Sequence, residues 1–110
     1  MKLTVEDGYI VADGGHIWAG HAVLEAIQVG VRVYVIYDYM DFPRQHPARN
    51  FFAHDLAGNT LWRVADIGGG AVDAYTHFIS AQPLTVFNLA GCECIIDEAN
   101  GQVLSTRFTR

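Results

Sequence analysis

Charged side chains are scarce in this sequence, and basic ones are scarcer than acidic ones. Only 17% of its 110 residues are charged, with seven lysines and arginines against twelve aspartates and glutamates, for a formal net charge of −5. Tight binding to nucleic acid needs a basic surface that neutralises phosphates, so the composition argues against a nucleic-acid partner. A chain that is 51% hydrophobic and poor in charge has apolar surface to hide, which predicts a homo-oligomer.

Long apolar runs are absent as well, and so is a signal-like N-terminal segment. No stretch approaches the roughly 20 apolar residues of a membrane-spanning helix. Glu6 and Asp7 interrupt the N-terminal segment before a signal-peptide core develops, so we expect a cytoplasmic protein without a membrane partner. The length predicts a single domain, residues 1–110, whose core needs neither a metal nor a disulfide.

The sequence has only two cysteines, Cys92 and Cys94. In a cytoplasmic protein they are expected to be reduced thiols. On a strand they point to the same side, where a disulfide between them would be strained. A reactive thiol needs a neighbouring cation, whereas the residue between them is Glu93, so we expect both thiols to pack in the core.

The sequence is organised around a β-branched and aromatic run, Val31–Tyr39. Read with period two, its alternate residues form two faces, and both faces are largely apolar. A strand of this kind needs apolar cover on both sides, which predicts a central position in a sheet. We expect a second copy of the chain to supply part of that cover, through an interface formed by Tyr34, Ile36 and Met40.

Turn signals divide the rest of the sequence into short extended segments. Asp7-Gly8 predicts a tight hairpin, and Asp55–Asn59 and Glu98–Gly101 predict two longer ones. Residues 20–28 are ambiguous between a strand and a two-turn helix, and we favour the strand. The predicted fold is mostly β: an antiparallel meander of about eight to ten short strands that forms a curved sheet or a small open barrel. The alternative is an α+β fold with a short helix near residues 18–28 packed on the sheet.

Two stretches of the sequence resemble a known group of proteins. They are IYDYMDFPRQHPARNFFAHDLAGNTLWRV, residues 36–64, and CECIIDEANGQVLSTRFTR, residues 92–110. The shared pattern is an aromatic residue with aspartate, a proline loop, Arg-Asn, and then a hairpin that ends in Leu-Trp-Arg. In these features the chain resembles small uncharacterised bacterial proteins that include products of mobile integron gene cassettes. The resemblance implies a compact β-rich domain that oligomerises, and it implies no activity.

The proline-bracketed loop 41–50 carries the most concentrated chemistry of the sequence. It brings three potential cations into six residues: Arg44, His46 and Arg49. Such a cluster can receive a carboxylate or a phosphate, and the candidate ligand-binding set also includes Asp38 and Asp41. The alternative interpretation is that the two arginines form ion pairs with these aspartates or with Asp55, and so fix the loop.

The other reactive residue types show no spacing typical of a site. The five histidines form no HxH or HExxH motif, so we predict no metal site and no cofactor. No serine lies in a nucleophile elbow and no pair of carboxylates has a recognisable spacing, so we assign no catalytic residue. The aromatic side chains are expected in the core or in a subunit interface, with a small-molecule pocket as the alternative.

These observations favour a small cytoplasmic binding or interaction module that self-associates. The alternative is a small-molecule or anion-binding protein, or an enzyme, that uses the loop 41–50. The expected partner is thus a second copy of the chain. Another protein or a small anionic molecule is the alternative partner.

Overall fold

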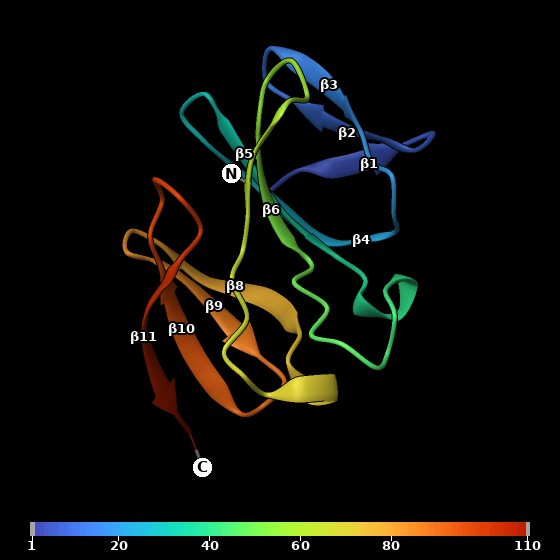
Figure 1. Cartoon of the computed structure of the whole chain (residues 1–110). Helices are drawn as coiled ribbons and strands as arrows, with labels where there is room; N and C mark the ends of the chain where they lie inside the picture. Colours follow the sequence, from blue (N-terminus) through green and yellow to red (C-terminus); the bar gives the residue numbers. More distant parts are fainter. Residues whose placement is uncertain (1, 110) are drawn as a thin grey trace.

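The computed structural model describes residues 2–109, which form three antiparallel sheets (Figure 1). The N-terminal sheet has the order β1-β2-β3, the central sheet β4-β5-β6-β7, and the C-terminal sheet β11-β10-β9-β8. The strands are β1 (Thr4–Glu6), β2 (Tyr9–Ala12), β3 (Gly15–Trp18), β4 (Val23–Val29), β5 (Arg32–Tyr37), β6 (Phe51–Asp55), β7 (Thr60–Arg63), β8 (Tyr75–Ala81), β9 (Leu84–Asn88), β10 (Cys92–Ile96) and β11 (Val103–Phe108). The prediction of a mostly β, antiparallel meander is confirmed, and none of these three sheets closes into a barrel.

The segment that was ambiguous in the sequence is strand β4, and the alternative of a helix near residues 18–28 is wrong. β4 pairs with β5 from Val23 to Val29, so that its backbone hydrogen bonds are made across the hairpin. Ala26 is buried between the sheets. A helix of nine residues would need tertiary support to form, whereas the strand gains a full ladder with its neighbour. The only helical segments in the described chain are two 3-10 turns, η1 (Tyr39–Asp41) and η2 (Gly70–Val72).

Strand β5 occupies the centre of the fold, as its two apolar faces predict. Its odd-numbered residues pack with the N-terminal sheet in one hydrophobic core, and its even-numbered residues pack with the C-terminal sheet in another. The strand is shorter than the apolar run, because Val31 lies in the β4–β5 turn and is exposed, and Tyr39 begins η1. Each β5 side chain from Val33 to Tyr37 is buried.

The expectation that a second copy covers one face of β5 is wrong. The C-terminal sheet of the same chain covers that face, so Tyr34 is 1% exposed and Ile36 is fully buried. Neither side chain is accessible to a partner. Met40, the third residue of the expected interface, is exposed, but it lies in η1 rather than on the strand.

Asn50 joins the central sheet to the C-terminal sheet. Its side-chain amide nitrogen donates to the carbonyl oxygens of Tyr37 and Tyr75, at 2.6 and 2.7 Å, and its side-chain oxygen accepts the Tyr75 N–H at 2.9 Å. Tyr37 ends β5 and Tyr75 begins β8, so one fully buried side chain satisfies the backbone of both strands. Without it, three polar backbone groups would be buried without a partner.

A second connection lies at the opposite end of these sheets, where the β10–β11 turn meets the central sheet. The Glu98 carbonyl oxygen accepts hydrogen bonds from Arg32 Nη1 and from Trp62 Nε1, and the Tyr34 hydroxyl donates to Glu98 Oε1 at 3.2 Å. Gly101, in the same turn, has φ of +77° and lies directly against the Trp62 ring. The turn is therefore held on the central sheet by both hydrogen bonds and packing.

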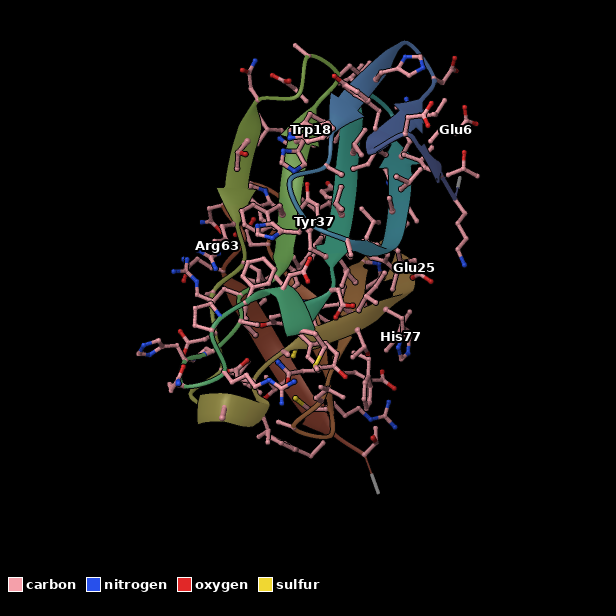
Figure 2. The ribbon with its side chains drawn as sticks, turned by 90° about the vertical axis from the view of Figure 1, so that its right-hand side faces the viewer. Glu6, Trp18, Glu25, Tyr37, Arg63 and His77 are labelled. Carbon is pink, nitrogen blue, oxygen red and sulfur yellow. The ribbon has the colours of Figure 1, made fainter. Side chains whose placement is uncertain are left out.

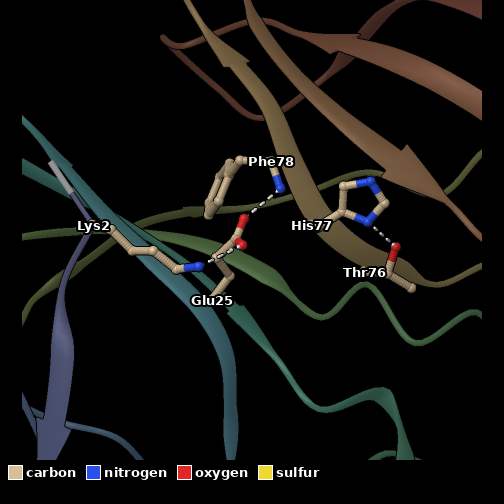
Figure 3. Close-up of polar contacts among 5 residues, drawn as sticks. All are labelled: Lys2, Glu25, Thr76, His77 and Phe78. Atoms are coloured by element: carbon tan, nitrogen blue, oxygen red, sulfur yellow. Dashed lines mark hydrogen bonds and ion pairs between the residues drawn. The ribbon is translucent and has the colours of Figure 1, made fainter.

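A third connection closes the free edge of β8. Glu25 on β4 accepts the Phe78 N–H with Oε1 at 2.7 Å, and its Oε2 lies 3.4 Å from Lys2 Nζ (Figure 3). This carboxylate therefore satisfies an amide at the edge of the C-terminal sheet, where no strand pairs with β8.

Both cysteines are reduced and buried, with their sulfur atoms 3.7 Å apart, as expected for core thiols. Among residues 2–109, no helix is both long enough and apolar enough to cross a membrane.

Candidate functional site

The loop between β5 and β6 surrounds two adjoining hollows. The smaller has a volume of about 240 Å³ and is lined by Tyr39, Met40, Pro43, Arg44, His46, Ala48, Ala71 and Ala74. The wider and more open one is lined by Phe42, Pro43, His46, Pro47, Ala48, Arg49, Arg63 and Asp66. Pro43, His46 and Ala48 line both, so the two hollows adjoin, and we refer to them together as the depression along the loop. The structure thus brings the three predicted cations of the loop to one surface.

The two predicted aspartates do not belong to this surface. Asp38 begins η1 and accepts the Met40 N–H with its carboxylate, as an N-cap residue does. Asp41 accepts the Ala22 N–H at 3.0 Å and so fixes the loop to the start of β4. Neither residue lines the hollows. Both carboxylates hold the backbone of the loop in place, and neither belongs to the candidate ligand-binding site.

The alternative that the loop arginines form ion pairs with these aspartates is also wrong. Within residues 2–109 the only ion pair joins Lys2 and Glu25, far along the chain from the loop. Arg44 donates to the sulfur of Met40 at 3.4 Å, and Arg49 Nε donates to the Val64 carbonyl at 2.8 Å. Asp55 is occupied by the β6–β7 turn, where it accepts three hydrogen bonds from Ala57 and Asn59.

Arg63 adds a fourth cation, which the sequence analysis missed. Its Nε donates to the Arg49 carbonyl at 2.9 Å, and its Nη2 donates to the Ala48 carbonyl at 2.9 Å. The guanidinium carbon lies 5.2 Å from the centre of the Phe52 ring and 5.6 Å from that of Phe42, within the range of cation–π interactions. Figure 2 shows Arg63 at the outer edge of the view, with Tyr37 further inside the molecule.

Two of these cations lie close enough to influence each other. The pKa of Arg63 is lowered, mainly because the guanidinium is partly buried and also because the positive charge of Arg49 is nearby. Arg49 has φ of +46°, in the left-handed region that few residues other than glycine adopt. The loop thus holds a residue with strained backbone whose positive charge lies near a second cation and, among residues 2–109, forms no ion pair with a carboxylate. Strain of this kind is often found at functional sites.

The floor of the loop is fixed by a buried carboxylate, Asp73. Its Oδ2 accepts the N–H groups of Ile67 and Gly69, and its Oδ1 accepts Asn88 Nδ2 at 2.9 Å. Its backbone carbonyl accepts the Ala48 N–H at 3.0 Å. Asp73 therefore ties the segment that contains η2 to the cationic loop, and positions Ala71 and Ala74 in the wall of the smaller hollow.

A buried histidine lies behind the loop, among aromatic rings. His54 Nε2 is 3.0 Å from the Tyr37 hydroxyl, and His54 Nδ1 is 3.3 Å from the Thr60 hydroxyl. Burial lowers the pKa of His54, an effect that the charge of Asp55 partly opposes, and burial raises the pKa of Tyr37 to about 12. A neutral imidazole has one N–H donor and one acceptor nitrogen. One hydroxyl can accept the hydrogen bond from the N–H, and the other can donate one to the acceptor nitrogen.

We expect this histidine to make stability depend on pH. The unfolded chain takes up a proton near pH 6.5, whereas folded His54 takes it up only at lower pH, so the stabilisation present above pH 6.5 is lost as the pH falls. One such proton changes the free energy of unfolding by at most about 1.4 kcal/mol per pH unit. Urea unfolding measured between about pH 5 and 7.5 should give a flatter profile for His54→Gln. The matched change at exposed His16 should leave the wild-type slope, and parallel profiles for wild type and His54→Gln would contradict this role.

Comparison with protein families now places the chain. A model described as a domain of unknown function, DUF7957, matches residues 1–108. The chain belongs to the DUF7957 family. Comparison with curated proteins and with solved structures gives no match. The description of the family names no activity, and it makes no link to integron cassette proteins.

In this DUF7957 chain, the remaining residue types of the sequence analysis serve structural roles or lie apart. No three His, Cys, Asp or Glu side chains converge as metal ligands anywhere in residues 2–109. Tyr34, Phe51 and Trp62 pack in the core, whereas Trp18 is exposed on the N-terminal sheet against Tyr9. Of the aromatic side chains expected in the core or a pocket, Tyr39 lines the smaller hollow.

Proposed function

We propose that this DUF7957 chain binds a small organic anion in the depression along the loop 41–50. The observation that carries the proposal is the pair Arg49 and Arg63, two neighbouring guanidinium groups. Among residues 2–109 neither has a carboxylate partner, and their hydrogen bonds go to backbone carbonyls. Burial and, to a smaller extent, the charge of Arg49 lower the pKa of Arg63, and an anion between the two groups would offset both effects. Guanidinium groups bind carboxylates and phosphates with two parallel hydrogen bonds.

The shape of the depression limits the size and chemistry of the rest of the ligand. The smaller hollow is lined mainly by apolar groups, those of Tyr39, Pro43, Ala71 and Ala74 among them. Its 240 Å³ is below the range of about 300–1,000 Å³ typical of pockets for drug-sized ligands. A ligand with a compact apolar body and one anionic group would fill the smaller hollow and direct its charge, past His46, to the two arginines.

The test is an isothermal titration calorimetry experiment, in which benzoate or inorganic phosphate is added to the protein at low and at high salt. We expect Arg49→Asn to weaken binding at least about tenfold, because one charge-assisted hydrogen bond contributes about 1.5–3 kcal/mol and 1.4 kcal/mol is a factor of ten. Asparagine is chosen because it tolerates the left-handed backbone of residue 49 better than alanine does. Wild-type affinity should also fall with salt.

The matched control removes a positive charge elsewhere. Arg107 lies on β11, outside both hollows, so Arg107→Asn lowers the net charge equally without touching the loop. Equal affinities for the folded Arg49→Asn protein and wild type would contradict the proposal, as would equal losses in the two variants. Preference for benzoate over phosphate would support the apolar part of the site.

A further inference from the structure

The outer face of the N-terminal sheet exposes two large aromatic rings. Tyr9 on β2 and Trp18 on β3 are directly opposite each other in the register, so both side chains point to the same side of the sheet. The neighbouring pair, Ile10 opposite Ile17, points to the other side and is buried in the core. Tyr9 is 44% exposed and Trp18 is 63% exposed. Exposed aromatic side chains that lie together are typical of a binding surface.

Contacts within the chain hold these two rings in position. The ring centroids of Tyr9 and Trp18 are 5.1 Å apart and the ring planes meet at 65°, an edge-to-face arrangement. A Cβ added at Gly8 would lie 2.8 Å from Trp18 Cζ3, so the indole packs against the backbone of the β1–β2 turn. The indole is therefore positioned before any partner binds, and a partner would not have to order it.

A carboxylate without a cation lies beside these rings. Glu6 on β1 is directly opposite Tyr9, so Glu6, Tyr9 and Trp18 form one row across the three strands. Directly opposite residues have Cβ atoms about 4.5–5.5 Å apart, which brings the Glu6 carboxylate within reach of a group bound over Tyr9. In the described part of the chain, the single ion pair is that of Lys2 with Glu25, and the Glu6 carboxylate accepts no hydrogen bond. Figure 2 shows Glu6 and Trp18 at the upper end of the molecule.

The chemistry of this row suits an arginine side chain. A guanidinium group stacks on aromatic rings through cation–π interactions, and it forms two parallel hydrogen bonds with a carboxylate. The chain already contains the first of these contacts, since the Arg63 guanidinium carbon lies 5.2 Å from the centre of the Phe52 ring. An arginine whose apolar stem lies on Trp18 can place its guanidinium over Tyr9 and against Glu6. A neutral ligand would contact the rings but would gain nothing from the charge of the carboxylate.

The shape and charge of this surface favour a partner protein over a small molecule. Small-molecule sites are concave and enclose most of the ligand, whereas this row lies on the open face of a sheet. One exposed cation–π contact strengthens binding only about two- to fivefold, so stable binding needs further contacts around it. The net charge of −5 attracts a basic segment to the chain.

We propose that the row of Glu6, Tyr9 and Trp18 binds an arginine-containing basic segment of another protein. The arginine side chain stacks on the two rings, and its guanidinium pairs with the Glu6 carboxylate. None of the three residues lines the hollows at the loop 41–50, so this interaction does not depend on anion binding there.

The first test is an NMR titration of the protein with a blocked peptide of alternating arginine and glycine residues. The indole N–H signal of Trp18 should shift, whereas that of Trp62, which is 7% exposed and bonded to the Glu98 carbonyl, should not. A peptide with glutamine in place of arginine should leave both signals unchanged. No shift of the Trp18 signal with the arginine peptide, or an equal shift with the glutamine peptide, would overturn the proposal. A Trp18 signal that shifts with protein concentration alone would overturn it too, because a second copy would then cover this face.

Calorimetric titration of variants with the same peptide separates the stacking from the charge. Trp18→Leu should weaken binding about two- to fivefold, whereas Phe108→Leu, which removes an equally exposed ring from β11, should not change it. Glu6→Gln should weaken binding at least about twofold more than Asp13→Asn, which removes the same charge from the exposed β2–β3 turn. Wild-type affinity in Trp18→Leu would overturn the proposal, as would equal losses in Glu6→Gln and Asp13→Asn, because attraction by net charge alone would then explain binding.

Discussion

Replacement of Asn50 by alanine is expected to destabilise the protein by about 3–5 kcal/mol. The change removes three hydrogen bonds, each with a net contribution of about 1 kcal/mol, and leaves the N–H and C=O of Tyr75 and the C=O of Tyr37 without their partner. Where the partner stays buried and unsatisfied, the loss is instead about 1–3 kcal/mol per group, and water that enters the space keeps the total near the lower end of that sum. Because domains are stable by only about 5–15 kcal/mol, the variant should be close to unfolding at room temperature.

Two further variants separate the hydrogen bonds from the loss of volume. Asn50→Asp keeps the shape but replaces the donor with a second acceptor, so it should be at least as unstable as Asn50→Ala at neutral pH. Asn100→Ala removes an exposed asparagine whose oxygen accepts the Gln102 N–H, and should cost about 1 kcal/mol or less. Urea unfolding of the three variants measures the free energies. A loss below about 1 kcal/mol for Asn50→Ala would show that the two sheets do not depend on this side chain.

The second large effect is expected at Gly101, where a single methyl group should cost about 2–5 kcal/mol. Alanine at φ of +77° is strained by about 1–2 kcal/mol, and its Cβ would lie 2.5 Å from Trp62 Cε3 and 3.1 Å from the Arg63 carbonyl oxygen. Relief of this overlap requires the turn to move away from the central sheet, at an additional cost of about 1–3 kcal/mol. The Trp62 and Arg32 hydrogen bonds to Glu98 would lengthen with it.

Gly30 provides the control for this prediction. It also has positive φ, +61°, but a Cβ added there meets nothing within 4 Å. Gly30→Ala should therefore show the backbone strain alone, and the difference between the two variants measures the packing of the turn on Trp62. Thermal unfolding of both proteins gives the comparison. Equal losses at the two positions would mean that the contact with Trp62 is not stabilising.

The strands could be predicted from the sequence because their signals are local. Alternation, β-branched residues and turn dipeptides such as Asp7-Gly8 act within a few residues, and the structure has Asp7 and Gly8 at φ of +52° and +82° in the first hairpin turn. The assembly of the strands into three sheets could not be predicted. It depends on Asn50, Glu25 and Glu98, whose partners lie 13 to 66 residues away in the chain. Nothing in their immediate neighbours distinguishes them from surface residues.

For the candidate site, too, the sequence predicts residues that are close together in the chain but not contacts between distant ones. Arg44, His46 and Arg49 could be found because they are close in the sequence, and the structure places all three at the hollows. Asp38 and Asp41 are equally close in the sequence, but their carboxylates accept backbone N–H groups instead. Asp38 bonds to the first turn of η1 and Asp41 bonds to Ala22, and the loop sequence alone does not reveal these partners. Arg63 lies 14 residues from Arg49, and only the β6–β7 register, which puts Arg63 opposite Phe52, brings it to the loop.

The shared position of β5 has a consequence for how the sequence can change. Its alternate side chains pack into two different hydrophobic cores, so every residue from Val33 to Tyr37 belongs to one core or the other. An insertion or deletion of one residue in this strand would exchange the two sets, sending the small valines toward the C-terminal sheet and Tyr34 toward the N-terminal one. Sequence length in this family should therefore vary in the loops and stay constant across these six residues of β5.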